Sequence, residues 1–292
     1  MGTIKELHFN KKTITSGNII EQMIYQRELT RGRKLTPRQL GKRATAKYKR
    51  WLRNIATWEG EPTTPESRKL SMLRAKKTLT RLIDSNIHQY TNAKGRPYPP
   101  VFLTLTFAED IRDQKQGNKL FTQFIKNLNY YLFKEKKNIL KYSVVIEFQD
   151  KTRDGVIHYH AIFYNLPYIK KEKLDKIWDR GFLGVKEVKK AKSISRYVTK
   201  YMAKNFDDVR LDKHKRYFSS RDLIKPKVYA GDFAYEKIRN VIPNTAQVWE
   251  KNFDTQYKGK ITKTVFTLPN KDDLSTYMNQ EDFQEIKQYD IS

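Results

Sequence analysis

The chain has 292 residues, enough for one large domain or two modest ones, and it contains no cysteine, which excludes disulfides, thiolate metal sites and thiol nucleophiles. It carries 59 Lys and Arg against 32 Asp and Glu, which gives a formal charge of +27. A charge of this sign and size implies a polyanionic partner, for which nucleic acid is the first candidate and an anionic membrane surface the second. No run of about 18 apolar residues occurs, so we expect a cytoplasmic protein that does not span a membrane.

The first third of the chain predicts basic helices. Residues 1–35 are polar and show no convincing period, whereas Thr36-Pro37 and Thr64-Pro65 are each typical of a helix start. In the second of these helices we expect the apolar face to consist of Leu70, Leu73, Leu82, Ile83 and Ile87. The opposite faces are rich in cations, which would either grip DNA phosphates or only keep the protein in solution. The candidate DNA-binding residues are Arg43, Lys47, Arg50, Lys76, Lys77 and Arg81.

A turn-rich segment over 92–100 predicts a domain boundary, so that residues 1–95 form a basic helical region and residues 96–235 a second domain. Residues 236–292 are left as a C-terminal extension of unknown role. Apolar alternation and helical spacing predict the elements of the second domain. They are a strand over 101–107, a helix over 117–136, strands over 142–148 and 157–164, a helix over 168–178, a strand over 182–188 and a helix over 193–205. This order predicts an α+β fold whose sheet is antiparallel, with helices packed mainly on one side.

Two histidines lie one residue apart inside the strand predicted over 157–164. Side chains alternate along a strand, so His158 and His160 point to the same face. If Asp150–Gly155 turns a hairpin, Glu147 lies opposite one of the two histidines, on their face. One carboxylate and two imidazoles suit Mg²⁺ or Mn²⁺ acting on a phosphate. A paired core histidine and a structural zinc site are the alternatives.

Two tyrosines follow about forty residues later. Tyr197 and Tyr201 are four residues apart and share one face of a helix, and Lys200 and Lys204 repeat that spacing. A tyrosine that attacks a phosphodiester forms a covalent phosphotyrosine and frees a 3′-hydroxyl, so the step can reverse and strands can be rejoined. Ordinary core packing explains such a pair in isolation. Arg196 and Arg221 are further candidates for DNA contacts.

Over residues 100–206 these patterns resemble the HUH endonuclease superfamily. Phe102-Leu103-Thr104-Leu105-Thr106 is similar to its first motif, His158-Tyr159-His160 to its second, and the segment from Tyr197 to Lys204 to its third. The two tyrosines are similar to those of rolling-circle replication initiators of phages and plasmids. A Lys-Tyr-x-x-Lys context, seen in single-tyrosine relatives, favours Tyr201 as the first nucleophile.

The resemblance implies a central five-stranded antiparallel sheet with an RRM-like core and flanking helices over 96–235. It also implies a divalent metal and nicking at an origin through a 5′-phosphotyrosine. We therefore expect a metal-dependent nickase and strand-transferase that acts on single-stranded origin DNA, at a hairpin or nick site. No Gly-x-x-x-x-Gly-Lys-Ser/Thr loop occurs, so a host helicase and polymerase would be its partners. A two-tyrosine rolling-circle transposase and a non-catalytic DNA-binding protein with a structural metal remain the alternatives.

Overall fold

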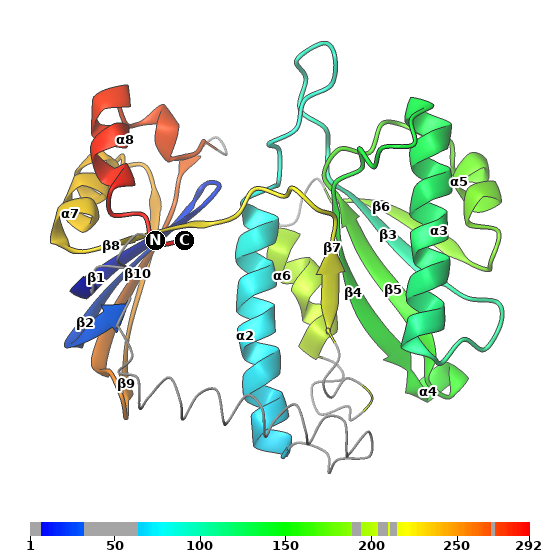
Figure 1. Cartoon of the computed structure of the whole chain (residues 1–292), viewed down its shortest axis with the longest axis horizontal. Helices are drawn as coiled ribbons and strands as arrows, with labels where there is room; N and C mark the ends of the chain where they lie inside the picture. The colour runs from blue at the N-terminus through cyan, green and yellow to red at the C-terminus, as the bar shows by residue number, and fades with distance from the viewer. Residues whose placement is uncertain (1–6, 32–63, 189–193, 204–209, 211–214, 270–271) are drawn as a thin grey trace, which may run out of the picture. The chain divides into compact units, whose positions relative to one another are not determined.

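The described part of the chain forms two sheets. The computed structural model describes residues 7–31, 64–188, 194–203, 210, 215–269 and 272–292. It divides into two compact units, one of Met1–Thr63 with Lys227–Ser292 and the other of Thr64–Pro226. Each unit holds a five-stranded antiparallel sheet with helices, which confirms the predicted α+β class (Figure 1). In the part of the chain that the structure describes, no helix has the length and apolar character needed to cross a membrane.

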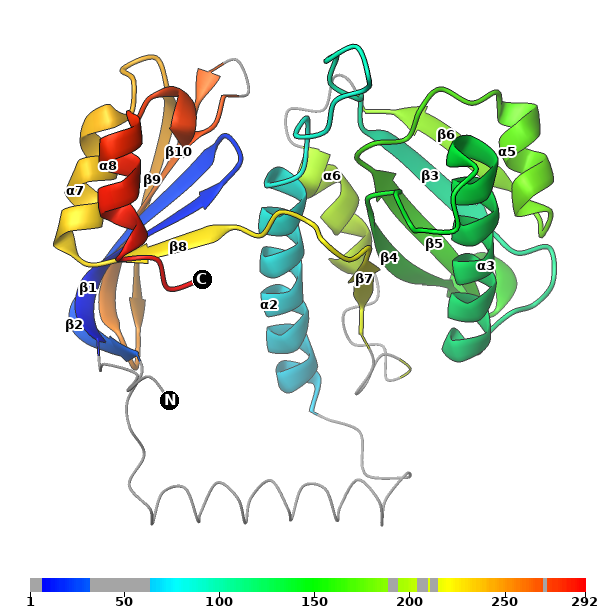
Figure 2. The same cartoon turned by 45° about the horizontal axis from the view of Figure 1, so that its top comes forward.

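The sheet of the second unit has the strand order β6-β3-β5-β4-β7. Its strands are β3 (Val101–Thr106), β4 (Tyr142–Gln149), β5 (Val156–Phe163), β6 (Leu183–Glu187) and β7 (Tyr217–Ser219). Four helices flank this sheet: α2 (Pro65–Asp84), α3 (Gln114–Phe133), α5 (Lys171–Trp178) and α6 (Ile194–Thr199). Figures 1 and 2 show α3 and α5 over one face and α2 and α6 over the other. The expectation that helices pack mainly on one side was therefore wrong.

The β4–β5 hairpin has the register that the sequence predicts. A single helical turn, α4 (Asp150–Arg153), joins the two strands. Asp154 and Gly155 complete the connection with positive φ angles of 45° and 79°, a backbone region that glycine enters freely. Glu147 is then the direct partner of His158. Because opposed residues in a ladder share a face, this register puts the carboxylate beside the imidazoles.

The two faces of the sheet bury separate apolar clusters. Under α3 and α5, Tyr159 is fully buried against Phe107 and Phe121 and donates a hydrogen bond to Asn118 Oδ1 at 2.9 Å. Under α2 and α6 lies a smaller cluster that includes Phe102. The residue between the two histidines therefore anchors β5 from the far face, and the imidazoles face α6.

The helix α2 begins as expected, because the Thr64 side chain accepts a hydrogen bond from Ser67 N and Pro65 occupies the first turn. Its inward face includes Ile83, as expected, but not Leu70 or Leu73. Leu70 and Leu73 are 54% and 47% exposed, whereas the buried positions are Arg68, Met72, Leu79 and Ile83. These positions follow one another at spacings of four and seven residues, which defines one stripe along the helix.

The first unit corrects the expected domain limits. Residues 7–31, expected in a helical region, form β1 (Leu7–Ser16) and β2 (Ile19–Arg31). The other three strands are β8 (Lys227–Ala230), β9 (Gln247–Thr255) and β10 (Gly259–Thr267), and the sheet order is β8-β1-β2-β10-β9. The residues after 236 are thus not a separate extension, because β9 and β10 complete a sheet that the N-terminal strands begin.

Two helices cover one face of this sheet. They are α7 (Asp232–Val241) and α8 (Gln280–Lys287), and a short 3-10 helix, η4 (Leu274–Thr276), precedes α8. Ile238 of α7 and Ile286 of α8 are fully buried in one cluster with Ile20 and Phe266 of the sheet. The segment from Leu274 to Lys287 is therefore helical in two short pieces.

Candidate active site

Glu147, His158 and His160 form a cluster of potential metal ligands. One ligand atom from each residue lies within 4.8 Å of the other two. His160 Nε2 and Glu147 Oε2 are 2.5 Å apart, and both side chains are largely buried. The two imidazole rings stack with centroids 4.7 Å apart. The strand alternation and hairpin register anticipated from the sequence thus bring all three side chains together.

The neighbouring strand β3 supplies supports that the sequence did not single out. Thr106 is the direct partner of His158, and a hydrogen bond of 3.1 Å joins Thr106 Oγ1 to His158 Nε2. Phe102 stacks on His160 with ring centroids 5.7 Å apart. Both residues lie in the segment identified as the first motif. A hydroxyl at that position fixes the orientation of the imidazole.

The helix that was expected to carry both tyrosines ends earlier than predicted. α6 stops at Thr199, and a 3-10 helix, η1 (Lys200–Ala203), continues the chain. The Tyr201 ring stacks on His160 with centroids 3.6 Å apart and an interplanar angle of 20°. The Tyr201 hydroxyl donates to the Tyr197 hydroxyl at 3.4 Å. The two hydroxyl groups are therefore adjacent, although the helix type changes between them.

The ring of Phe102 packs against both tyrosines. Its ring meets Tyr197 edge-on at 5.3 Å and lies nearly parallel to Tyr201 at 5.7 Å, between centroids. Since His160 also stacks on Phe102, one aromatic side chain of β3 contacts a potential metal ligand and both potential nucleophiles. This packing sets the distance between the potential metal ligand His160 and the two potential nucleophiles.

Two lysines lie against Tyr197. Lys200 Nζ is 4.2 Å from the centroid of the Tyr197 ring and 5.0 Å from that of Tyr201. Lys186, on β6, places its Nζ 5.1 Å from the Tyr197 centroid. The sequence drew attention to Lys200 but not to Lys186, because only the β3–β6 pairing of Phe102 with Lys186 brings β6 beside the helix.

The two tyrosine hydroxyls are electrostatically unequal. The hydrogen bond from Tyr201 lowers the pKa of Tyr197, and the ammonium groups of Lys186 and Lys200 lower it further, against the opposing effect of burial. Burial raises the pKa of Tyr201, and the hydrogen bond to Tyr197 and the charge of Glu147 add to that rise. Of the two, Tyr197 is the hydroxyl that loses its proton more readily.

The remaining candidate residues are distributed as follows. Lys204, Arg43, Lys47 and Arg50 lie outside the described residues. Lys76, Lys77 and Arg81 are on α2, which packs beside α6 on the histidine face of the sheet. Arg196 is exposed on α6, and Arg221 is exposed just after β7, where its backbone carbonyl accepts a hydrogen bond from Lys141.

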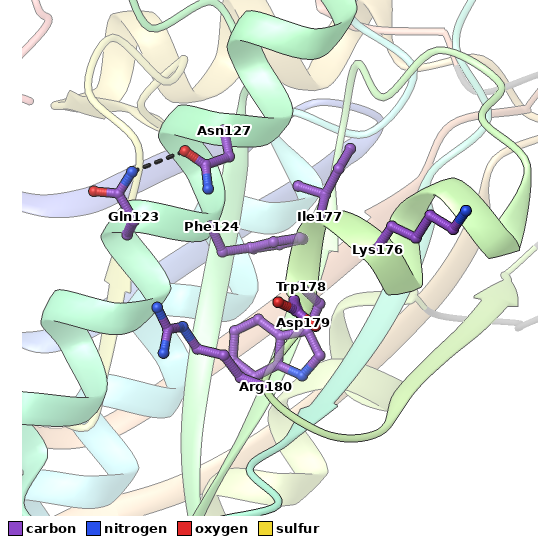
Figure 3. A pocket seen from close by; sticks show the side chains of 8 residues that line it. All are labelled: Gln123, Phe124, Asn127, Lys176, Ile177, Trp178, Asp179 and Arg180. Atoms are coloured by element: carbon purple, nitrogen blue, oxygen red, sulfur yellow. Dashed lines mark hydrogen bonds between the residues drawn. The ribbon is translucent and has the colours of Figure 1, made fainter.

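A cleft of about 360 Å³ lies on the opposite side of this sheet (Figure 3). It is bounded by α3 and the C-terminal end of α5, and its lining includes Trp178, Phe124, Arg180 and Lys176. A hydrogen bond between Gln123 and Asn127 closes one side. None of the candidate site residues lines this cleft, so it is separate from the histidine cluster.

Comparison with known proteins adds one finding. Residues 100–206 match the model of a family described as replication-associated protein ORF2/G2P. Searches of curated proteins and of solved structures found no match. The matched segment runs from the start of β3 past η1, and so contains the histidines, Glu147 and both tyrosines. The match supports a role in replication for this part of the chain.

The cluster suits a divalent cation by the chemistry of its donors. Imidazole nitrogens and a carboxylate oxygen are ligands that Mn²⁺ accepts, and the carboxylate also suits Mg²⁺. A further donor lies on the same face of β4, where the Gln149 side-chain oxygen is buried and has no hydrogen-bond partner among the described residues. A buried, unsatisfied oxygen near such a cluster is compatible with a polar ligand there.

Replacing one imidazole tests this site directly. In a calorimetric titration with Mn²⁺, His158→Ala is expected to weaken binding at least about tenfold, because one of three donors is lost. The matched control is His8→Ala, whose imidazole pairs with Glu28 on the exposed surface of the first unit. Equal Mn²⁺ affinity in His158→Ala and wild-type protein, both folded by circular dichroism, would contradict a metal site at this cluster.

Proposed function

We propose that the chain is a rolling-circle replication initiator of the HUH type, which nicks single-stranded DNA and transfers the strand through a tyrosine. The observation that carries the proposal is the Tyr201 ring stacked on His160, with the Tyr197 hydroxyl 3.4 Å from that of Tyr201. One tyrosine ring therefore packs against a potential metal ligand, and the hydroxyl of the second tyrosine adjoins that of the first. The family match over residues 100–206 supports the link to replication.

The reaction divides into two transfers. A tyrosine hydroxyl gives up its proton as its oxygen forms a bond to phosphorus, the bond from phosphorus to the 3′-oxygen breaks, and that oxygen takes up a proton. The 5′-phosphate stays on the enzyme, so a later 3′-hydroxyl can attack it and release the tyrosine. Two adjacent tyrosines allow a second strand to be captured before the first is released.

The side chains of the site divide the tasks of this reaction among them. Glu147, His158 and His160 would hold Mg²⁺ or Mn²⁺, which when bound supplies Lewis-acid polarisation of the phosphate. Thr106 orients His158 through its hydrogen bond, and Phe102 holds the tyrosines at their distance from the imidazoles. Lys186 and Lys200 stabilise negative charge on the attacking oxygen and on the phosphate.

The geometry favours Tyr197 over Tyr201 as the first nucleophile, which reverses the preference drawn from the Lys-Tyr-x-x-Lys context. Tyr197 accepts the hydrogen bond from Tyr201, and Lys186 and Lys200 both lie over its ring. An acceptor beside two cations is the better place for a phenolate. Tyr201 is then positioned for the second transfer.

Removal of both tyrosines tests the chemistry. Oligonucleotides that tile the replicon carrying the gene, incubated with the protein and Mg²⁺ or Mn²⁺, are expected to give a covalent protein–DNA adduct on denaturing gels. Tyr197→Phe/Tyr201→Phe should give none, since no phenolic oxygen remains at the site. The matched control is Tyr130→Phe/Tyr131→Phe on the exposed side of α3. Absence of any wild-type adduct, or an adduct in the Tyr197/Tyr201 double variant, would contradict the mechanism.

Single substitutions separate the two tyrosines. We expect Tyr197→Phe to slow the first adduct by a larger factor than Tyr201→Phe does, because it removes the oxygen with the lower pKa. Peptide mass mapping of the wild-type adduct after one turnover should locate the nucleotide on Tyr197. An adduct found on Tyr201 under the same conditions would restore the preference drawn from the sequence.

Lys186 provides a test that the sequence did not suggest. Lys186→Ala should slow adduct formation by about tenfold or more, since an ammonium group beside the attacking oxygen is lost. Lys186→Arg should recover part of the rate because it keeps the charge. The control is Lys126→Ala, which removes an exposed lysine on α3, over the other face of the sheet. A wild-type rate in Lys186→Ala would exclude a role for this side chain.

A further inference from the structure

The sheet of the first unit has one face that α7 and α8 cover and one that they do not. The covered face carries Ile20 and Phe266, which are buried with residues of both helices. Across the strands, Trp249 of β9 pairs with Val265 of β10, and Val265 pairs with Glu21 of β2. Glu21 in turn pairs with Ile14 of β1. Because directly paired residues share a face, Trp249 lies on the face that does not hold Ile20 and Phe266.

The strand β9 forms the exposed margin of that second face. It is the edge strand of the sheet, next to β10 (Figure 1). Further in, the same face buries Ile14, Met23, Tyr25 and Ile261. At the margin, in contrast, Trp249 is 53% exposed and Phe253 is 39% exposed. Large aromatic side chains at this level of exposure mark a contact surface rather than a core.

The side chains of β9 alternate in chemistry as well as in direction. Trp249, Lys251 and Phe253 point to one side, and Val248, Glu250, Asn252 and Asp254 point to the other. Glu250 and Asn252 accept hydrogen bonds from Thr264 and Thr262 of β10. On the aromatic side, Lys251 is exposed and pairs with no carboxylate within the ranges that the structure describes.

The turn after β9 extends the same chemistry. Tyr257 is 82% exposed, and Lys258 and Lys260 follow it as exposed cations. Lys258 Nζ lies 5.3 Å from the centroid of the Tyr25 ring, on the face that carries Trp249. We call the set of Trp249, Lys251, Phe253, Tyr257 and Lys258 the β9 surface.

We propose that the β9 surface binds single-stranded DNA by stacking bases on Trp249 and Phe253 while Lys251 and Lys258 contact the phosphates. Exposed aromatic rings interleaved with cations are the combination that binds single strands without base-specific readout. The two rings are four residues apart on one side of a strand, or about 13 Å, which leaves room for a base on each. The charge of +27 for the whole chain favours an anionic partner for this surface.

This inference rests on the proposed function for the kind of strand, since a nicking enzyme of this class acts on DNA. Its location is independent of the histidine cluster, because the β9 surface lies in the other unit. The first unit would then hold the strand, and the second unit would cut and rejoin it. A surface without base-specific readout suits a strand whose sequence varies as replication proceeds.

Binding is measured with the full chain, a fluorescein-labelled 30-nucleotide oligo-dT and EDTA in the buffer, so that a protein that never nicks still gives a readable result. By fluorescence anisotropy, Trp249→Ala and Phe253→Ala should each weaken binding roughly tenfold. Trp249→Phe should keep most of the affinity, because it keeps an aromatic ring. Val248→Ala, on the other side of β9, is the matched control and should bind as wild type does.

The salt dependence of the same assay tests the lysine. Lys251→Gln should reduce the slope of log affinity against log salt by about 0.7, the value for one phosphate contact with a single strand. Wild-type affinity in the Trp249→Ala/Phe253→Ala double variant would overturn the proposal. If that variant instead lost self-association in sedimentation while DNA affinity stayed unchanged, the β9 edge would be a protein interface, and the proposal would be equally wrong.

Discussion

The register of the β4–β5 hairpin is the constraint on which the candidate site depends. Side chains alternate with a period of two, so a slip of one residue would turn Glu147 away from the imidazoles. The turn at Asp154 and Gly155 and the buried Tyr159 on the far face hold that register. The pairing of Glu147 with His158 follows directly. A short loop with positive φ angles thus determines whether three potential ligands converge.

The second element of the site is aromatic packing between β3 and α6. Phe102 contacts His160, Tyr197 and Tyr201, so it couples the strand with the potential ligands to the helix with the potential nucleophiles. Stacking at these distances is favourable and directional, which limits how far the hydroxyls can move from the imidazoles. Lys186 then approaches Tyr197 from the edge strand β6. The site is therefore assembled from four strands, α6 and the 3-10 helix η1 rather than from a single motif.

The two units follow different rules of assembly. The second unit is continuous in sequence, and its elements alternate in the order that local patterns predict. The first unit joins β1 and β2 to strands more than 190 residues later. The hairpin signal of the first unit was present in the sequence, since Gly17-Asn18 is a typical two-residue turn and Gly17 has a φ of 57°. Hydrophobic alternation around this turn is weak, because Glu21 and Gln22 are buried among apolar neighbours. The strands could therefore not be predicted from the sequence pattern.

The features that depend on neighbours along the chain could be predicted from the residue pattern. These are the shared face of His158 and His160, the opposition of Glu147, the cap at Thr64 and the adjacency of Tyr197 and Tyr201. Other features follow only from the packing of the folded units: the exposure of Leu70 and Leu73 on α2, the contact of Thr106 with His158, the approach of Lys186 to Tyr197 and the pairing of β1 and β2 with strands after residue 226. The physical reason is that period and capping act over a few residues, whereas strand order and helix packing are chosen by burial over the whole unit.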